Sequence, residues 1–207
     1  DKTINDSIIY FYVMIWASRL GIYLFRRVQK DGKDVRFEKA KTHFFWFLQY
    51  WMGQALWVSL TACAAIIAIL SPEEDSLPVL AMLGMALWLT GFTIESISDY
   101  QKRVFRKENN PSKSFIHTGL WARSRHPNYF GEITLWTGIA IIALNTLAGI
   151  EYITLISPVF VYILLTRMSG VNLLERIADE RYGELEEYQR YKKNTPVLIP
   201  KLSKDKN

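Results

Sequence analysis

Long apolar runs separated by short charged connections organise most of this chain. Phe44 to Leu70 is twenty-seven residues without a charge, and Leu77 to Ile94 and Ile133 to Ile150 are eighteen each. A helix needs about 20 mostly apolar residues to cross a bilayer, so such runs are typical of spanning helices. Two weaker stretches, the second containing Pro158, extend the pattern. The chain is therefore predicted to be an all-α, polytopic membrane helix bundle of about five helices, over residues 8–25, 44–70, 77–94, 129–150 and 152–168.

The last part of the chain has a different pattern, in which apolar and charged residues alternate at helical spacing. The apolar and aromatic positions are Leu173, Leu174, Ile177, Leu185, Tyr188 and Tyr191. This spacing predicts an amphipathic helix that is broken near Gly183, followed by the return of "TPVLIP" to the membrane surface, within a cytoplasmic tail over 170–207. We interpret 1–207 as a single integral-membrane domain. Because the chain begins at Asp1 rather than Met, we expect one or more helices upstream.

The charges predict the topology. Lysine and arginine are concentrated in residues 26–41, 102–125 and 167–207, whereas the connections 71–76 and 145–151 contain neither. With five helices that alternate direction, every basic block lies on the same side of the membrane, and the positive-inside rule makes that side cytoplasmic. The net charge of +5 therefore indicates contact with membrane lipids rather than with nucleic acid. The single cysteine excludes a disulfide within the chain.

Glu132 is an ionisable residue about one turn inside the fourth predicted helix, on the same face as Asn128 and Tyr129. Ionisable groups at membrane depth are costly and usually face a partner or a wet cavity, so they mark candidate functional sites. The alternative is an ordinary helix start, because Pro127 suits the first helical position and acids favour the first turn. That alternative gives no role to Asn128 or to the preceding residues Arg125 and His126.

Two further carboxylates, Glu95 and Asp99, lie at i and i+4 near the end of the third predicted helix. They repel each other unless a cation or a hydrogen-bond donor lies between them. Arg103 and Arg106 follow one and two turns further on and offer the bidentate geometry that phosphates need. The alternative is a frayed cytoplasmic helix end in which Arg103 pairs with Asp99.

Taken together, the predicted cytoplasmic ends supply cations, amides and acids. This mixture suits a polar, phosphate-bearing cofactor, because cations bind phosphates while amides and acids bind hydroxyls and a carboxamide. A metal site is not predicted, because the three histidines, at 43, 117 and 126, lack ligand-type neighbours at helical spacing. A "GxGxxG" phosphate loop is absent from the sequence. The contributing residues are Glu95, Asp99, Arg103, Arg106, Lys113, Arg123, Arg125, His126, Asn128, Glu132 and Glu175.

Two motifs resemble the membrane steroid 5α-reductase family, namely "GLWARSRHPNYFGE" and "RYGELEEYQRYKKNTPVLIP". The chain is most similar to the bacterial branch of uncharacterised-function domains, which "WASRLGIYLFRRVQKDGKDVR" also resembles; sterol reductases and lamin B receptor are relatives. "RHPxYxG" also occurs in isoprenylcysteine carboxyl methyltransferases, which tend to have serine and an apolar or aromatic residue where this chain has Asn128 and Glu132. These two residues favour the reductases. The bacterial branch implies the bacterial inner membrane rather than the endoplasmic reticulum.

The resemblance implies that NADPH binds in a cavity open to the cytoplasm and that hydride passes to an activated C=C bond of a steroid- or isoprenoid-like lipid. Asp99 and Arg106 match the family's "SDY…R" segment, here "SDYQKRVFR", and Glu175 matches an acid seven residues before a Tyr–Gly pair. We expect Asn128 to bind the carboxamide, the arginines to bind phosphates, and Asp99 and Glu132 to bind ribose or amide groups. The expected cofactor-binding residues are Asp99, Arg103, Arg106, Arg125, His126, Asn128, Tyr129, Glu132 and Glu175.

The family's ketone-polarising residues are not matched. The tyrosine that precedes the arginine corresponding to Arg19 is Trp16 here, and the helix carrying the family's glutamate would precede Asp1. Tyr50 lies in a similar neighbourhood, "WFLQY", but on the wrong side of Arg19 in chain order. The catalytic residues are therefore unknown, and Tyr12, Trp16 and Tyr50 are candidates for contact with a lipid substrate.

Two other interpretations stay open. A methyltransferase using S-adenosylmethionine on a prenylated or lipid substrate would share the architecture, but it needs fewer phosphate partners than this chain offers. A non-enzymatic membrane scaffold would need none of them, and it predicts that Asn128→Ala and Glu132→Gln alter only stability.

Overall fold

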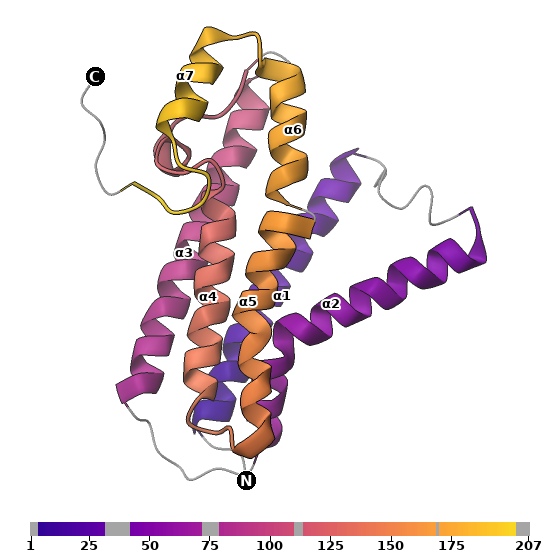
Figure 1. Ribbon diagram of the computed structural model, residues 1–207, viewed down its shortest axis with the longest axis vertical. Helices are drawn as coiled ribbons and strands as arrows, with labels where there is room; N and C mark the ends of the chain where they lie inside the picture. Colours follow the sequence, from indigo (N-terminus) through magenta and orange to yellow (C-terminus); the bar gives the residue numbers. More distant parts are fainter. Residues whose placement is uncertain (1–3, 32–41, 72–78, 110–113, 169, 202–207) are drawn as a thin grey trace. The chain divides into compact units, whose positions relative to one another are not determined.

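The computed structural model describes residues 4–31, 42–71, 79–109, 114–168 and 170–201. Every regular element within these residues is helical (Figure 1), which confirms the all-α class. Lys113 and most of the connections 26–41 and 71–76 lie outside the described residues. The elements are α1 (Ile4–Asp31), α2 (Phe44–Leu70), α3 (Val79–Glu108), η2 (Gly119–Ala122), α4 (Pro127–Ala143), η3 (Gly149–Ile156), α5 (Ser157–Ile163), η4 (Leu164–Met168), α6 (Val171–Tyr182) and α7 (Glu186–Asn194).

Four helical stretches within the described residues are long and apolar enough to cross a membrane. They are Ile4–Arg26, Phe44–Leu70, Val79–Glu108 and Gly149–Tyr182. The protein is therefore a polytopic helical membrane protein, as predicted. In the last of these stretches the helix type changes from 3₁₀ (η3) to α (α5) to a π turn (η4). Pro158, the second residue of α5, accounts for the first change, because proline cannot donate a backbone hydrogen bond.

The predicted membrane helix over 129–150 is wrong at its end, because α4 stops at Ala143. Its 17 residues span about 26 Å, less than the roughly 30 Å of a bilayer's hydrocarbon core. Asn145 and Thr146 explain the stop, since their side chains donate hydrogen bonds to the carbonyls of Ile142 and Ala143 at 3.4 and 2.9 Å. Polar side chains that bond the last carbonyls offer the backbone an alternative to continuing the helix.

The predicted helix over 77–94 is also too short, because α3 continues to Glu108 as one helix of 30 residues. Glu95, Asp99, Arg103 and Arg106 therefore belong to a single rigid element, and the first interruption is at Asn109. At the other end of the chain, α6 and α7 flank the break predicted near Gly183.

The chain forms two compact units by its internal contacts. The first unit is Asp1–Leu83 with Ile139–Ser157, and the second is Gly84–Gly138 with Pro158–Asn207. The interpretation of 1–207 as one reductase-like domain stays a prediction.

The first unit contains α1, α2 and η3, and it is held by contacts between backbone and small polar side chains. The Cys63 thiol donates a hydrogen bond to the carbonyl of Thr154 at 3.2 Å, joining α2 to η3. At the end of α2, the Ser71 hydroxyl donates to both carboxylate oxygens of Glu151 at 3.2 Å. The buried face of α2 consists of alanines, which lets its neighbours approach closely.

In the second unit, α3 and α4 lie side by side (Figure 1). Their backbones approach closely at glycines. A Cβ at Gly131 would lie 2.6 Å from the Glu95 nitrogen, and a Cβ at Gly138 would lie 2.7 Å from the Trp88 nitrogen. Any side chain at these positions would push the helices apart. The glycine in "RHPNYFGE" therefore has a physical reason: it lets the Glu95 turn of α3 lie against the first turns of α4.

Candidate functional site

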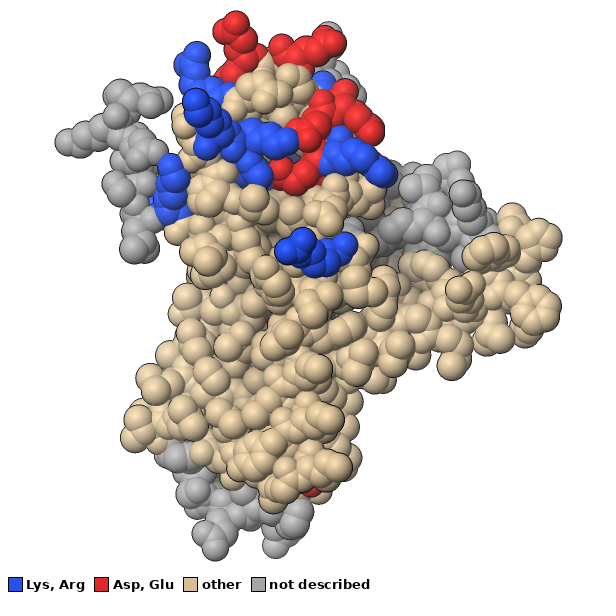
Figure 2. Space-filling model, viewed as in Figure 1, with Lys and Arg blue, Asp and Glu red and all other residues tan. Residues whose placement is uncertain are grey.

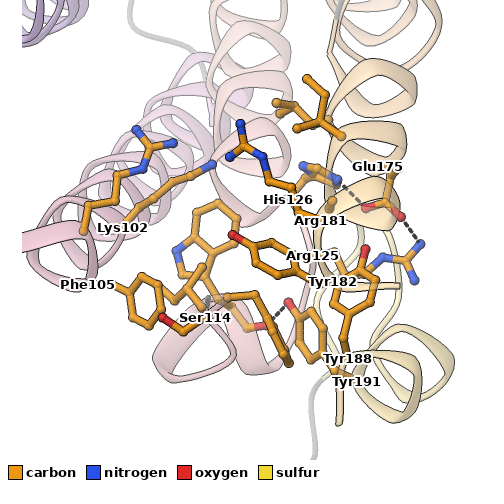
Figure 3. A pocket seen from close by; sticks show the side chains of 17 residues that line it. Lys102, Phe105, Ser114, Arg125, His126, Glu175, Arg181, Tyr182, Tyr188 and Tyr191 are labelled. Atoms are coloured by element: carbon orange, nitrogen blue, oxygen red, sulfur yellow. Dashed lines mark hydrogen bonds and ion pairs between the residues drawn. The ribbon is translucent and has the colours of Figure 1, made fainter. Parts of the chain in front are cut away.

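A pocket of about 170 Å³ lies in the second unit (Figure 3). It is formed by α3, by the connection between α3 and α4, and by α6 and α7. Its lining residues are Lys102, Phe105, Arg106, Ser114, Phe115, Ile116, Trp121, Arg125, His126, Leu174, Glu175, Ile177, Ala178, Arg181, Tyr182, Tyr188 and Tyr191. Figure 2 shows charged side chains gathered over α6 and α7 at this end of the unit.

Glu175 holds two of the predicted site residues. Its carboxylate accepts a hydrogen bond from His126 Nε2 at 2.8 Å and pairs with Arg125 Nη2 at 3.0 Å (Figure 3). All three side chains are largely buried, with exposed fractions of 18%, 6% and 12% for Glu175, His126 and Arg125. Arg125 Nη1 also donates to the carbonyl of Lys192 at 2.6 Å. The carboxylate and this carbonyl therefore fix the positions of both basic side chains.

Two other arginines of the pocket are not neutralised in this way. Arg106 of α3 and Arg181 of α6 line the pocket, and within the described residues neither forms an ion pair with a carboxylate. The Lys102 ammonium lies 4.6 Å from the centroid of the Trp121 ring, in the range of a cation–π contact. The pocket therefore presents three cations, from two helices far apart in sequence, beside the Arg125–Glu175 pair.

An aromatic cluster forms one side of the pocket, with Phe115 at its centre. The Phe115 ring centroid lies 5.8, 5.2 and 5.3 Å from those of Tyr182, Tyr188 and Tyr191. Aromatic rings at such distances provide rigid apolar area with polar edges. This wall can stack against a flat ring and exclude water from it.

The two α7 tyrosines in this wall stay neutral over the physiological pH range. Burial, with help from Asp179 and Glu175, raises the pKa of the Tyr188 phenol far above its ordinary value. Burial also raises the pKa of Tyr191, and nearby Arg125 only partly offsets the shift. The Tyr191 hydroxyl donates to the carbonyl of Trp121 at 2.7 Å, which ties α7 to the connection between α3 and α4.

The other predicted polar residues, Asp99, Asn128, Tyr129 and Glu132, lie on α3 and in the first two turns of α4, and we call them the polar region. The Tyr129 ring stacks on the His126 ring, with centroids 5.5 Å apart and planes at 10°. The charges of Glu132 and Asp99 both act on the Tyr129 phenol. Since His126 lines the pocket, "RHPNYFGE" runs from the pocket wall into the residues of this polar region.

The predicted site residues thus separate into groups. The pocket lining includes Arg106, Arg125, His126 and Glu175, whereas Asp99, Asn128, Tyr129 and Glu132 lie in the adjoining polar region. Arg103 is exposed, with its guanidinium 5.3 Å from the Tyr100 ring centroid. The three candidates for substrate contact belong to α1 and α2 of the first unit: Tyr12, Trp16 and Tyr50. Their role stays a prediction.

The sequence analysis missed Lys102, Arg181 and the aromatic wall. The spacing of Leu174, Ala178, Arg181 and Tyr182 is the i, i+4, i+7, i+8 pattern of one helix face, and all four line the pocket. That pattern could have identified Arg181. Nothing in the local sequence indicates that this face of α6 lies opposite Lys102 on α3.

The residues present fit a phosphate-bearing nucleotide. Three buried polar atoms, His126 Nδ1, Arg125 Nε and Asn128 Oδ1, have no hydrogen-bond partner within the described part of the chain. Buried polar atoms are normally satisfied, so such atoms call for a ligand or water. The pocket is smaller than the roughly 300–1,000 Å³ of typical drug-sized sites. A pocket of this volume can enclose only part of a dinucleotide.

The fold and site define the class as an all-α integral membrane protein with a cationic and aromatic pocket at its charged end. The chain belongs to the family described as "Protein of unknown function (DUF1295)", whose model matches residues 1–195.

Among similar proteins are the 3-oxo-5-alpha-steroid 4-dehydrogenases 1 of mammals. The Mus musculus protein is 31% identical over 121 residues, which are 58% of this chain and 42% of the relative. For Rattus norvegicus the identity is 31% over 119 residues (58% and 40%), and for Homo sapiens it is 27% over 121 residues (58% and 41%). These findings confirm the predicted membership of the steroid 5α-reductase family. The chain matches about two fifths of the length of these relatives, and no solved structure matches it significantly.

Proposed function

We propose that this protein is an NADPH-dependent membrane reductase that acts on an activated C=C bond of a steroid- or isoprenoid-like lipid. One observation carries the proposal. The family motif residues Arg125 and His126 line a pocket together with Lys102, Arg106, Arg181 and an aromatic wall. The names of the mammalian relatives, which are steroid dehydrogenases, support the same class of reaction.

In this proposal, the cations of the pocket bind the phosphates of NADPH. Arg106 and Arg181 provide guanidinium groups suited to bidentate contact with phosphate oxygens, and Lys102 adds a third charge. Arg125 has fewer N–H groups left for a phosphate, because its terminal nitrogens already contact Glu175 and the Lys192 carbonyl. Arg103 is the weakest of the predicted phosphate ligands, because it is exposed and lies over Tyr100.

The polar region between α3 and α4 takes the nicotinamide end in this proposal. Asn128 binds the carboxamide, because its Oδ1 is buried and without a hydrogen-bond partner among the described residues. Asp99 and Glu132 accept hydrogen bonds from ribose or amide groups, and Tyr129 forms the link to the pocket through its stack on His126. When bound, NADPH supplies a hydride to one carbon of the C=C bond, and a proton completes the reduction at the other carbon.

The substrate is a lipid that enters from the bilayer, since α1, α2, the first part of α3 and the stretch from η3 to η4 expose large apolar side chains. Tyr12, Trp16 and Tyr50 are the residues we propose for its contact. We further propose that the protein resides in the bacterial inner membrane with its C-terminus in the cytoplasm. The basic residues near the pocket support that orientation.

A thermal-shift titration of detergent-purified protein with NADPH, NADH and S-adenosylmethionine tests the proposal. A ligand at a hundred times its dissociation constant stabilises a protein by about 2.7 kcal/mol, so binding is readable. We expect NADPH to raise the melting temperature and Asn128→Ala and Arg106→Ala to reduce the shift. Stabilisation by S-adenosylmethionine instead would assign the site to methyl transfer. Absence of a shift with all three ligands would contradict both enzyme interpretations and favour a scaffold.

A further inference from the structure

The segment after α7, residues 195–201, lies against the connection that carries Arg125 and His126. The Arg125 amide donates to the Pro196 carbonyl at 2.9 Å, and the His126 amide donates to the Val197 carbonyl at 3.0 Å. In the opposite direction, the Lys201 amide donates to the Arg123 carbonyl at 3.0 Å. We call residues 195–201 the C-terminal strap.

A buried serine strengthens the same contact. Ser124 is fully buried, and its hydroxyl donates to the Leu198 carbonyl at 2.8 Å. The same oxygen accepts a hydrogen bond from the His126 amide at 3.2 Å. Ser124 therefore joins the backbone of the site to the backbone of the strap.

The connection over residues 123–126 depends on the strap, because it belongs to no helix. It follows η2 and ends at Pro127, the first residue of α4. The Arg123 and Ser124 amides donate to the Leu120 carbonyl of η2, whereas the Arg125 and His126 amides have the strap carbonyls as acceptors. Pro196 suits the role of hydrogen-bond acceptor, because it has no backbone N–H that needs a partner and its carbonyl can accept the bond. Without the strap, the Arg125 and His126 amides would lose their carbonyl acceptors.

We propose that the C-terminal strap is a positioning element of the nucleotide site, a proposal that rests on the function proposed above. The strap holds the backbone of Arg125 and His126, while Glu175 and the Lys192 carbonyl hold their side chains. Arg125 Nε and His126 Nδ1, two buried atoms without a hydrogen-bond partner among the described residues, are thereby kept at fixed points of the pocket wall. The strap sets nucleotide affinity without touching the nucleotide.

Two variants test this proposal, one of them with a matched control. Lys201→Pro removes the amide that bonds Arg123, whereas Lys201→Ala removes the side chain and keeps that amide. Ser124→Ala removes the hydroxyl bridge. At a temperature where all unliganded variants remain folded by circular dichroism, we expect Lys201→Pro and Ser124→Ala to bind NADPH about two- to tenfold more weakly than the wild type. Lys201→Ala should bind as the wild type does.

Amide hydrogen exchange in the ligand-free protein provides a second readout that needs no nucleotide. The Arg125 and His126 amides should be protected in the wild type and exchange faster in both variants. If these amides are unprotected in the wild type, or if both variants bind NADPH with wild-type affinity, the strap is not a positioning element. If the wild type binds no nucleotide although the amides are protected, the proposed function fails first, and the role of the strap fails with it.

Discussion

The contacts that hold the helices together differ between the two compact units. In the first unit, large apolar side chains are exposed, such as Phe45 at 80% and Ile150 at 86%, and its helices meet through alanines and single hydrogen bonds. In the second unit, α3 and α4 touch at glycines, and the buried side chains include Glu95, Ser124 and His126. The second unit also contains the Arg125–Glu175–His126 contacts and the pocket described above. The chemistry that the sequence motifs predict is therefore concentrated in one unit.

This difference shows how much apolar and polar residues each indicate about the tertiary structure of a membrane protein. Lipid is as apolar as leucine, so an apolar side chain on a spanning helix needs no burial and identifies no neighbour. A buried carboxylate or histidine needs a partner, because leaving it unsatisfied is costly. The polar residues, together with the glycines that let backbones touch, therefore carry the information about tertiary structure.

Exchange of a glycine for alanine should have opposite effects in the two units. In Gly131→Ala, the added Cβ would lie 2.6 Å from backbone atoms of α3, which cannot move aside independently. We expect a loss of about 3 kcal/mol in unfolding free energy, the upper end for overpacking. Gly53→Ala, where nothing lies within 4 Å of the added Cβ, should raise stability by up to about 0.5–1 kcal/mol. Unfolding in detergent measures both, and equal losses would contradict the contrast.

Removal of the Glu175 carboxylate should destabilise the second unit. Glu175→Ala leaves the buried Arg125 and His126 without their shared acceptor, and a lost hydrogen bond to a charged group costs about 1.5–3 kcal/mol. Glu180→Ala is the matched control on the same helix, because its 3.9 Å pair with Arg176 is exposed at both ends and exposed pairs contribute little. Chemical denaturation should separate the two variants. If they unfold alike, the buried triad does not stabilise the site.

Nucleotide affinity should depend on Arg181 and not on its neighbour Arg176. Both lie on α6, but only Arg181 lines the pocket. Loss of one charge-assisted phosphate contact corresponds to about a tenfold weaker dissociation constant. Arg181→Ala should therefore weaken NADPH about tenfold and Arg176→Ala should leave it unchanged, as measured by isothermal titration. Equal weakening by both would indicate a general effect of surface charge.

The smallest expected effect concerns pH. Because the pKa of Tyr191 is raised in the folded protein, the unfolded chain releases this phenolic proton first, at its ordinary value of about 10. Loss of this proton stabilises the unfolded state relative to the folded state, so the free energy of unfolding should fall as pH rises above about 10. Tyr191→Phe should lower stability by about 1 kcal/mol at neutral pH, through loss of the bond to Trp121, and should flatten the alkaline decline. A melting curve series from pH 8 to 11 measures both; an unchanged alkaline slope in Tyr191→Phe would contradict the assignment.

The sequence predicted the fold where the signal is local. The charge-free run from Phe44 to Leu70 is α2 with the same bounds. The predicted helix over 129–150 was wrong beyond Ala143, because hydropathy does not detect that Asn145 and Thr146 cap a helix within an uncharged run. The sequence also did not predict that Arg181 lies opposite Lys102. The approach of α6 to α3 is a tertiary contact, and no periodic pattern in the sequence indicates it. Arg125 and His126 were predicted from a family motif, whereas the strap that holds them was visible only in the structure.

The most direct test of the central claim is deuterium transfer from NADPH into lipid. Purified protein in detergent is incubated with NADPH deuterated at C4, using each of the two stereoisomers, and with the total lipid extract of the membranes from which it was purified. Mass spectrometry then searches for any lipid that gains one deuterium from the cofactor and one further hydrogen. We expect such a lipid with one stereoisomer only, and none with the Arg106→Ala, Arg181→Ala double variant. Binding of NADPH with no deuterated lipid from either stereoisomer would contradict the reductase assignment.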